Sequence, residues 1–256
     1  MKDRKTLCVR LPVLCVFFML AGALYSQSEW RDGKRLQTLV SEADLNCCFF
    51  IHEGEDPAIQ IVGADKQKEK TFFSDWDVVY LNGGELQGIE TGQEYSVIEV
   101  GTSLKDFGRL SYRRGRVKIL SAAENKSVAE LLRTCEPIMI GHYIVPVMRG
   151  EKEGVEKKKI EQAVFDDRRV TGQCVYFQHD IKQIATGQWA LIDRGTEHGL
   201  HNNRQLFVFR RQNEGVSPKI FATAVVIDSQ SRTATIKILD CLDAVVIGDL
   251  VQPFPD

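Results

Sequence analysis

The sequence predicts a mainly β protein with two tandem small β-barrel or sandwich-like domains and a short N-terminal helical segment. Three observations predict this fold: an internal duplication, β-branched runs separated by glycine turns, and a composition of 43% hydrophobic and 27% charged residues among 256. That composition fits a globular protein and excludes a disordered or collagen-like chain. The predicted organisation is a signal peptide at 1–23, an N-terminal segment at 24–56, a β-domain at 57–148, a charged linker at 149–169 and a second β-domain at 170–256.

The first 23 residues have the three-part pattern of a secretory signal peptide. A basic start at 2–10 precedes an uncharged, mostly apolar run at 11–21, and Ala21-Gly22-Ala23 has the small residues of a cleavage site. The run is shorter than the roughly 20 residues of a membrane span, although an uncleaved anchor is the alternative. We therefore expect export to the periplasm or cell envelope, with no integral membrane span after cleavage.

The net charge of the chain limits which partners the protein is expected to bind. The net charge is −2, and removal of residues 1–23 leaves 29 basic and 34 acidic side chains. Such a mildly acidic body lacks the basic excess that attracts nucleic acid, so we expect no nucleic-acid partner.

The N-terminal segment contains a helical pattern. Leu36, Leu39, Val40 and Ala43 recur at the i, i+3, i+4, i+7 spacing of one helix face. This spacing predicts one short amphipathic helix within residues 26–46. The following residues, Cys47 to Ile51, are apolar and predict entry into a strand.

The chain then repeats itself. Residues 78–98 align without gaps with 189–209 at an offset of 111, and residues 140–146 align with 247–253 at an offset of 107. The second copy is therefore four residues shorter in between. We place the difference in the loop at 101–114, against 210–219, because loops absorb length changes more readily than paired strands.

The aligned glycines predict structural turns rather than a ligand site. Gly92 is matched by Asn203, and Asn is the residue that best replaces glycine at positive φ. A phosphate loop at 82–84 is disfavoured because the G-x-x-x-x-G-K pattern and a following helix are missing. The predicted turn positions are Gly84, Gly88, Gly92, Gly141, Gly195, Gly199, Asn203 and Gly248.

Short β-branched runs surround these turns. Residues 78–81 and 189–192 are apolar runs that end in Asn or Asp and glycine, and runs at 58–62 and 174–177 precede them. Each unit then has about six strands, and closure into a barrel or sandwich would remove its exposed edges. Between the units, residues 151–159 are dense in Glu and Lys, which predicts a solvated linker or short exposed helix, with contact of Lys157 to Lys159 with a polyanion as the alternative.

Five cysteines follow the signal sequence: Cys47, Cys48, Cys135, Cys174 and Cys241. An odd number cannot pair completely within one chain, and no C-x-x-C occurs to indicate a zinc ribbon or a thioredoxin-like site. The adjacent Cys47 and Cys48 could be a redox pair, but we expect two small apolar residues. We expect no required disulfide set, and Cys135 and Cys241, at nearly equivalent places in two barrels, should not bridge.

The sequence contains no recognisable catalytic set. His198 and His201 have a possible ligand spacing, but the first copy has Gln87 and Glu90 there, which is typical of loop drift. The pair His179-Asp180 has no G-x-S-x-G or H-E-x-x-H motif to complete it. We therefore expect a protein that is not an enzyme and that has no cofactor and no metal site.

The repeated block carries a family resemblance. The pattern is Val79-Tyr80-Leu81, Gly88-Ile89, Gly92 and Tyr95-Ser96-Val97, closing at 140–146. It resembles the small β-domain that follows LysM modules in some exported bacterial envelope proteins, and it is similar to the C-terminal domain of the flagellar assembly protein T. The Gly-Asp that this family shows before its last strand is kept at Gly248-Asp249 and changed at Gly141-His142.

This resemblance implies a non-catalytic scaffold or adaptor of the bacterial cell envelope, associated with a flagellar motor or with peptidoglycan and bound to other envelope proteins. Two alternatives stay open. A glycan-binding module would use a groove between the barrels, with exposed aromatic side chains near the repeat loops. An exported hydrolase would need a polar cleft that joins Cys174, His179 and Asp180.

Overall fold

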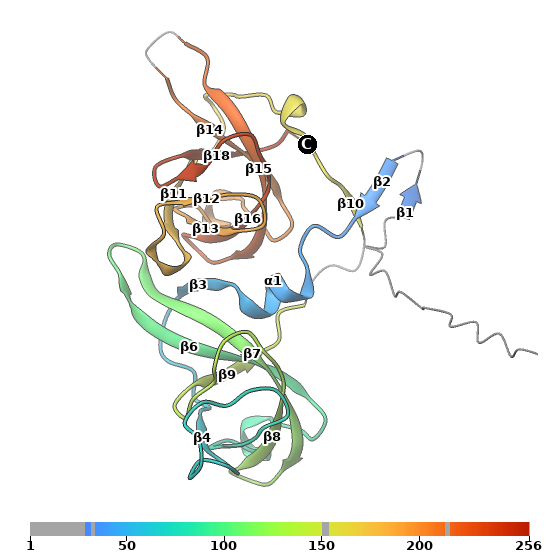
Figure 1. Ribbon diagram of the computed structural model, residues 1–256, viewed down its shortest axis with the longest axis vertical. Helices are drawn as coiled ribbons and strands as arrows, with labels where there is room; N and C mark the ends of the chain where they lie inside the picture. Colours follow the sequence, from blue (N-terminus) through green and yellow to red (C-terminus); the bar gives the residue numbers. More distant parts are fainter. Residues whose placement is uncertain (1–28, 32–33, 150–153, 213–215, 256) are drawn as a thin grey trace, which may run out of the picture.

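The computed structural model describes residues 29–31, 34–149, 154–212 and 216–255 (Figure 1). The predicted signal peptide and its cleavage site lie outside the described residues. The chain is mainly β, with 47% of residues in strands and 8% in helices, which confirms the predicted fold class. Within the part that the structure describes, none of the helices has the length and apolar character needed to span a bilayer.

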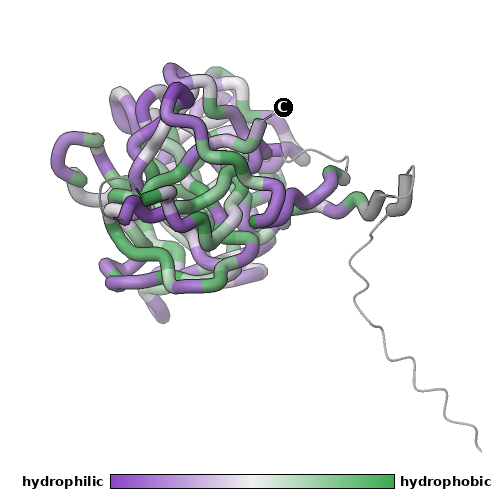
Figure 2. The backbone as a smooth tube through the Cα atoms, turned by 90° about the horizontal axis from the view of Figure 1, so that it is seen from above, coloured by the Kyte–Doolittle hydropathy of each residue, from purple (hydrophilic) through white to green (hydrophobic). Residues whose placement is uncertain are grey.

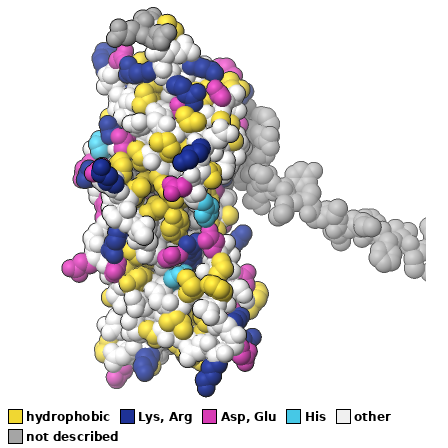
Figure 3. Space-filling view, turned by 60° about the vertical axis from the view of Figure 1, so that its left-hand side comes forward, with side chains coloured by type: hydrophobic (Ala, Val, Ile, Leu, Met, Phe, Trp, Pro, Cys, Tyr) yellow, Lys and Arg dark blue, Asp and Glu magenta, His cyan; other side chains and the backbone are white. Residues whose placement is uncertain are grey.

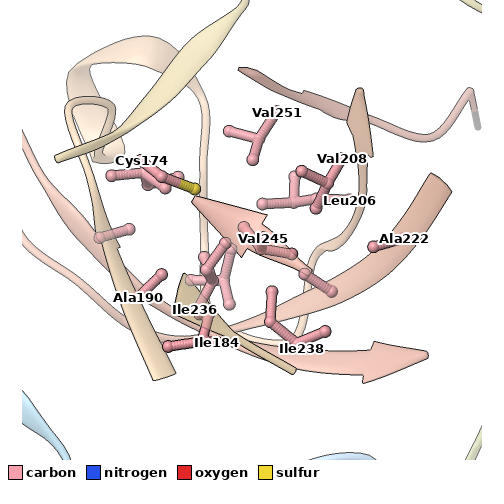
Figure 4. Close-up of a cluster of buried hydrophobic side chains, with 14 of the residues drawn as sticks. Cys174, Ile184, Ala190, Leu206, Val208, Ala222, Ile236, Ile238, Val245 and Val251 are labelled. Atoms are coloured by element: carbon pink, nitrogen blue, oxygen red, sulfur yellow. The ribbon is translucent and has the colours of Figure 1, made fainter. Parts of the chain in front are cut away.

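The second unit is a closed barrel with the strand order β11-β13-β16-β15-β14-β18. A short pair, β12 and β17, lies beside it. Its core of buried side chains, which includes Cys174, Val208 and Ile236, fills the inside of the barrel (Figure 4). The strands are β11 (Gly172–Phe177), β12 (Gln183–Ile184), β13 (Trp189–Ile192), β14 (Gln205–Arg210), β15 (Lys219–Ser229), β16 (Ala234–Cys241), β17 (Val245–Val246) and β18 (Leu250–Pro253).

The first unit repeats this topology in the order β4-β5-β8-β7-β6-β9. Its two end strands meet where Gln60 bridges to Tyr143 and the Ile61 N–H donates to the His142 carbonyl at 2.8 Å. The strands are β4 (Ile61–Ala64), β5 (Val78–Leu81), β6 (Glu94–Leu104), β7 (Gly108–Ala122), β8 (Ser127–Thr134) and β9 (Tyr143–Pro146). The identical strand order is the structural counterpart of the sequence duplication.

The glycine block forms the same turn in both units. A 3-10 turn, η1 (Glu85–Gln87) or η4 (Thr196–His198), is followed by the left-handed Gly88 or Gly199. Gly92 and Asn203 both have positive φ, at 86° and 66°, as predicted. Gly84 and Gly195 are needed for another reason, because a Cβ there would lie 1.8 Å and 2.1 Å from backbone carbonyl oxygens. Gly141 and Gly248 complete the set with φ values of 99° and 96°.

The length difference between the copies falls where the sequence places it, but in strands rather than in a loop. Strand β6 has 11 residues, whereas its counterpart β14 has 6. The longer β6–β7 hairpin gives the first unit an additional edge, and β3 (Phe49–His52) pairs with it from Phe49 opposite Tyr112 to His52 opposite Arg109. The extra residues are therefore tolerated because another strand pairs with them.

The N-terminal segment differs from the single predicted helix. Leu36 lies in β2 (Lys34–Gln37), and the helix α1 covers only Glu42–Cys47. Ser41 caps α1, since its Oγ accepts from the Asp44 N–H at 3.2 Å while Asp44 accepts from the Ser41 N–H at 2.7 Å. This capping box fixes the start of the helix, so the residues before it are extended. Strand β2 lies between β1 (Glu29–Arg31) and β10 (Val155–Glu156).

The described part of the linker, residues 154–169, packs against the second unit rather than standing in solvent. Strand β10 and the 3-10 turn η2 (Ile160–Gln162) lie in it. The ring of Phe165 packs on Phe209 with centroids 5.0 Å apart, and Lys157 pairs with Asp240 at 2.6 Å. Each described side chain of this segment nevertheless stays at least partly exposed, so the segment is a surface strand and turn docked on the second unit rather than a free linker or an exposed α-helix.

A disulfide joins Cys47 to Cys135, with Cα atoms 5.6 Å apart and 88 residues between them in sequence. The expectation that Cys47 is a small apolar strand residue is therefore wrong, and two of the five cysteines do pair. Cys47 ends α1, and packing of α1 on the first unit brings it to the end of β8. Cys48, Cys174 and Cys241 are free thiols, so Cys135 and Cys241 do not bridge, as predicted.

The two units are stacked along the long axis of the molecule, with α1 and β3 between them (Figure 1). Seen along that axis, the hydrophobic stretches of backbone lie inside and the hydrophilic ones form the outer loops (Figure 2). We call residues 41–52, which comprise α1 and β3, the bridging segment.

Candidate interaction surface

The outer face of four strands in the second unit is covered by the bridging segment. We call this sheet surface, on β11, β13, β16 and β15, the covered face. Leu191 and Val225 on it are completely buried, although they point away from the barrel core. Its outward residues are Val175, Tyr176, Trp189, Leu191, Val225, Ile227, Thr235, Lys237 and Leu239.

Polar groups fix the bridging segment on this face. The Thr235 hydroxyl donates to the Phe49 carbonyl at 2.7 Å. The Asp44 carboxylate accepts from Lys237 Nζ at 2.6 Å and from Trp189 Nε1 at 3.0 Å. Burial raises the pKa of Asp44, but the hydrogen bonds from Lys237, Ser41 and Trp189 outweigh it and hold the pKa below its ordinary value. Asp44 is therefore an ionised anchor.

An ion pair also crosses the interface directly. Arg113 on β7 lies 2.9 Å from Asp228 on β15, and both side chains are buried. Arg113 also donates to the Cys48 sulfur at 3.3 Å and stacks on the Phe50 ring. Because buried charges require such partners, these contacts fix the position of the two units relative to each other.

The first unit has an equivalent sheet surface, on β4, β5, β8 and β7, that nothing in the described chain covers. We call it the open face. The strand registers establish the equivalence, since Tyr80 pairs with Val128 as Leu191 pairs with Thr235. Val62, Tyr80 and Leu120 are 49%, 39% and 45% exposed, whereas Leu191 at the position of Tyr80 is 0% exposed. Its outward residues are Val62, Val78, Tyr80, Lys118, Leu120, Val128, Glu130 and Leu132.

The charge on the open face differs from that on the covered face. Glu130 pairs with Val78 in the register, as Lys237 pairs with Trp189, so a carboxylate replaces an ammonium group. Glu130 is half-buried, and among the described residues no cation lies within ion-pair distance of it. The exposed Lys118 lies opposite Glu130 on β7, where the covered face has Val225, without forming an ion pair with it. A half-buried carboxylate without an ion-pair partner is a recognition feature that the covered face lacks.

A strained tryptophan stands beside the open face. The Trp76 N–H donates to the Leu131 carbonyl at 2.8 Å, just as the Gly187 N–H donates to Ile238 at 2.8 Å, so the two residues are equivalent. Gly187 has φ 87°, and Trp76 adopts φ 70° with its side chain 73% exposed. Left-handed backbone costs a non-glycine residue about 1–2 kcal/mol, so Trp76 is held in place against its backbone preference.

The surroundings of Gly187 show where Trp76 lies on the open face. In the second unit, the turn with Gly187 borders a small hollow that is also lined by Leu39, Lys237 and Leu239. The turn therefore stands at the rim of the covered face, next to the chain that enters the bridging segment. By equivalence Trp76 stands at the rim of the open face, and Phe72, 60% exposed, precedes it in the same loop.

A groove of about 990 Å³ lies between the first unit and the bridging segment. The turn residues Gly88 and Gly92 line it, so predicted turn positions meet a cavity there. Arg116 in its wall pairs with Glu42 at 2.9 Å and with Glu94 at 3.4 Å. Since three of its four charged side chains pair with one another, the groove is a weaker candidate than the open face. On the side seen in Figure 3, hydrophobic side chains gather along the middle of the molecule.

The remaining candidate residues do not converge. Cys174 is buried in the barrel core, where burial raises the pKa of its thiol, while His179 and Asp180 are exposed. In the described chain no three His, Cys, Asp or Glu side chains come together as a metal site. His142, which aligns with Asp249, is buried like it, and each side chain accepts a backbone N–H from the residue three before it.

No protein-family model matches the chain, and no curated protein matches it at a significant level. Sequence reasoning did not find the open face, because it depends on which unit the N-terminal segment covers. Extending the repeat alignment by two residues at the same offset gives a signal for Trp76, since a bulky aromatic residue then stands opposite Gly187.

Proposed function

We propose that this protein is an exported, non-catalytic adaptor of the bacterial cell envelope, which binds other proteins through the open face of its first unit. The observation that carries the proposal is the contrast between two equivalent sheet surfaces. One is fully covered by polypeptide, and the other presents Val62, Tyr80 and Leu120 to solvent. Exposed apolar patches on a folded protein are typical of interaction sites.

Two features support the envelope location. Residues 1–23 have the pattern of a signal peptide, and the disulfide between Cys47 and Cys135 suits an oxidising compartment. The resemblance of both units to the domain that follows LysM modules and to the C-terminal domain of flagellar assembly protein T supports partners at the peptidoglycan or at a flagellar motor.

The non-catalytic role is favoured over a hydrolase by the position of one thiol. A nucleophilic cysteine needs access to solvent and a lowered pKa. Cys174 has neither, since it is completely buried and its thiol pKa is raised by burial. The set of Cys174, His179 and Asp180 therefore cannot form the cleft that the hydrolase alternative requires.

Glycan binding is the second candidate, and the exposed aromatics Phe72 and Trp76 favour it. Aromatic rings with one free face can stack on the apolar side of sugars. The groove between the first unit and the bridging segment does not favour it, because its aromatic residue Tyr95 donates its hydroxyl to Gln93 at 2.6 Å within the protein.

The experiment is fractionation and cross-linking of the tagged full chain in its native cell. We expect the protein in the periplasmic or envelope fraction, with a mature N-terminus near Leu24 or Gln27, and cross-linked to envelope proteins. A cytoplasmic chain that still begins at Met1 would contradict the export part of the proposal. Co-sedimentation with purified peptidoglycan, lost in Trp76→Ala, would favour the glycan alternative instead.

A further inference from the structure

We infer that the open face is a seat for an apolar polypeptide segment of another protein, which places a Lys or Arg side chain against Glu130. This inference rests on the proposed adaptor function and specifies its partner.

The covered face shows what kind of ligand this sheet surface accepts. In the second unit the ligand is a short capped helix followed by a strand. Phe49 packs edge-on against Tyr176 with centroids 5.3 Å apart, and Leu191 and Ile51 belong to the same apolar cluster. A segment of polypeptide is therefore the demonstrated occupant of one copy of the surface, which favours a polypeptide over a glycan on the other.

The side chains of the open face are suited to the same kind of segment. Val62 aligns with Val175, Leu120 with Ile227 and Leu132 with Leu239, so aliphatic character is kept at each of these places. Val128 replaces Thr235, whose hydroxyl holds the Phe49 carbonyl. The partner segment therefore gains apolar contact at that point and loses one backbone anchor.

Charge specifies the partner further. On the covered face Lys237 is neutralised by Asp44 of the bridging segment at 2.6 Å. On the open face Glu130 takes the place of Lys237, and the exposed Lys118 lies opposite it on β7 in the place of Val225. Since these two described residues form no ion pair, Glu130 stays available, and the complementary ligand presents a cation where the bridging segment presents Asp44. Complementary charges of this kind select partners and exclude those with the wrong sign. The bridging segment itself, with Asp44, is a poor ligand for the open face.

A second copy of this chain is also disfavoured. The bridging segment of each copy is already used, since β3 pairs with β7 and lies on the covered face. The free end of the second unit carries the shorter β14–β15 hairpin, and no described strand pairs with it as β3 pairs with β7. The partner is therefore a different protein.

Trp76 supplies the anchor at the rim. Its ring is 73% exposed, and its backbone is held at φ 70°, where the second unit has glycine. Strained, exposed aromatic residues are typical of binding hot spots. At the corresponding edge of the covered face lies Leu39, in the chain that leads into the bridging segment. By analogy, the partner segment reaches the open face past Trp76.

The test places the photo-cross-linker benzoylphenylalanine at Val62 or at Leu120 in the full chain, in the native cell. A third chain carries it at Leu242 of the second unit, which is 78% exposed, as the control position. We expect adducts at 62 and 120, absent at 242, in which the cross-linked peptide comes from another protein and contains Lys or Arg.

Charge reversal makes the test specific. Glu130→Lys should lower the yield of both adducts by at least about fivefold, while Glu161→Lys, the same change at an exposed site in η2, should lower it less than about twofold. Replacement of the partner's basic residue by Glu should restore the adduct with Glu130→Lys. If Glu130→Lys does not fold, as judged by its circular dichroism, Glu130→Gln with an expected intermediate loss takes its place.

The outcomes separate this inference from the proposed function. Three results would overturn the inferred binding site on the open face: adducts of this chain with itself, adducts with glycan alone, or equal yields for Glu130→Lys and Glu161→Lys. Capture of envelope proteins at other positions on the molecule would in that case leave the adaptor function intact. If the full chain captures no envelope protein at any position, the adaptor function itself fails.

Discussion

Arg113 of the first unit and Asp228 of the second form a buried ion pair, 2.9 Å apart, across the interface between the units. Removal of one partner leaves an uncompensated buried charge, which costs about 3–5 kcal/mol. We therefore expect Asp228→Asn to lower the free energy of unfolding by about 3 kcal/mol, measured by urea denaturation. The double variant Arg113→Met, Asp228→Leu should lose less than Asp228→Asn. Equal losses would show that the pair itself stabilises the interface.

The carboxylate of Asp44 predicts a dependence of stability on pH. Hydrogen bonds from Lys237, Ser41 and Trp189 hold its pKa below the ordinary value despite burial. Its stabilising effect is therefore present above the unfolded-state pKa, near 4, and is lost as the pH falls through the lower folded-state value. The difference in unfolding free energy between the natural protein and Asp44→Asn should be largest near pH 7 and shrink below about pH 4. A difference that does not change with pH would exclude this role.

The disulfide between Cys47 and Cys135 encloses a long stretch of chain, with 88 residues of separation. A bridge of that span stabilises by about 2–4 kcal/mol, mainly by restricting the unfolded chain. Cys135→Ser should lower the melting temperature by about 5–15 °C, and a reducing agent should have the same effect on the natural protein but none on the variant. Cys241→Ser, which removes a free thiol, is the matched control.

The turn at Gly92 predicts two different outcomes for two substitutions. Gly92→Asn should be mild, because Asn203 already adopts the same backbone in the second unit. Gly92→Val should lower the melting temperature, because left-handed backbone costs about 1–2 kcal/mol and β-branching adds to it. Differential scanning calorimetry measures both. Equal stability of the two variants, with loss of a partner in both, would indicate a ligand loop.

Trp76→Gly separates binding from folding. The change restores the residue of the second unit, Gly187, at the same left-handed backbone. Relief of strain and the greater flexibility of glycine in the unfolded chain nearly cancel, so stability should change by less than about 1 kcal/mol. The adduct yield at Val62 and Leu120 should nevertheless fall. A clear loss of stability would mean that the Trp76 ring has a structural role.

The repeat made much of the fold predictable. The aligned glycines located corresponding turns and strands, and the exchange of Gly92 for Asn203 indicated positive φ at both. These features are local, because they depend on a few neighbouring residues. Periodicity failed at Leu36, since hydrophobic spacing alone cannot show that Ser41 starts the helix later.

The candidate surface could not be predicted in the same way. The pairing of Cys47 with Cys135 depends on tertiary packing across 88 residues, and spacing carries no information about it. The difference between the open and covered faces depends on where residues 41–52 dock. Aligned positions such as Tyr80 and Leu191 are equally apolar in sequence, and only the fold separates them into 39% and 0% exposure.

The central position of the bridging segment also sets an order of assembly. The hydrogen bond at the Phe49 carbonyl requires Thr235, 186 residues later, and the one at the Asp44 carboxylate requires Lys237, 193 residues later. Contacts this distant in sequence form late, because a long loop must close first. The first unit can acquire its strands and its disulfide once β9 has been synthesised, but the junction closes only after β16 has been synthesised. During that interval the open face is already formed while the covered face is not, so the proposed partner can bind before the two units join.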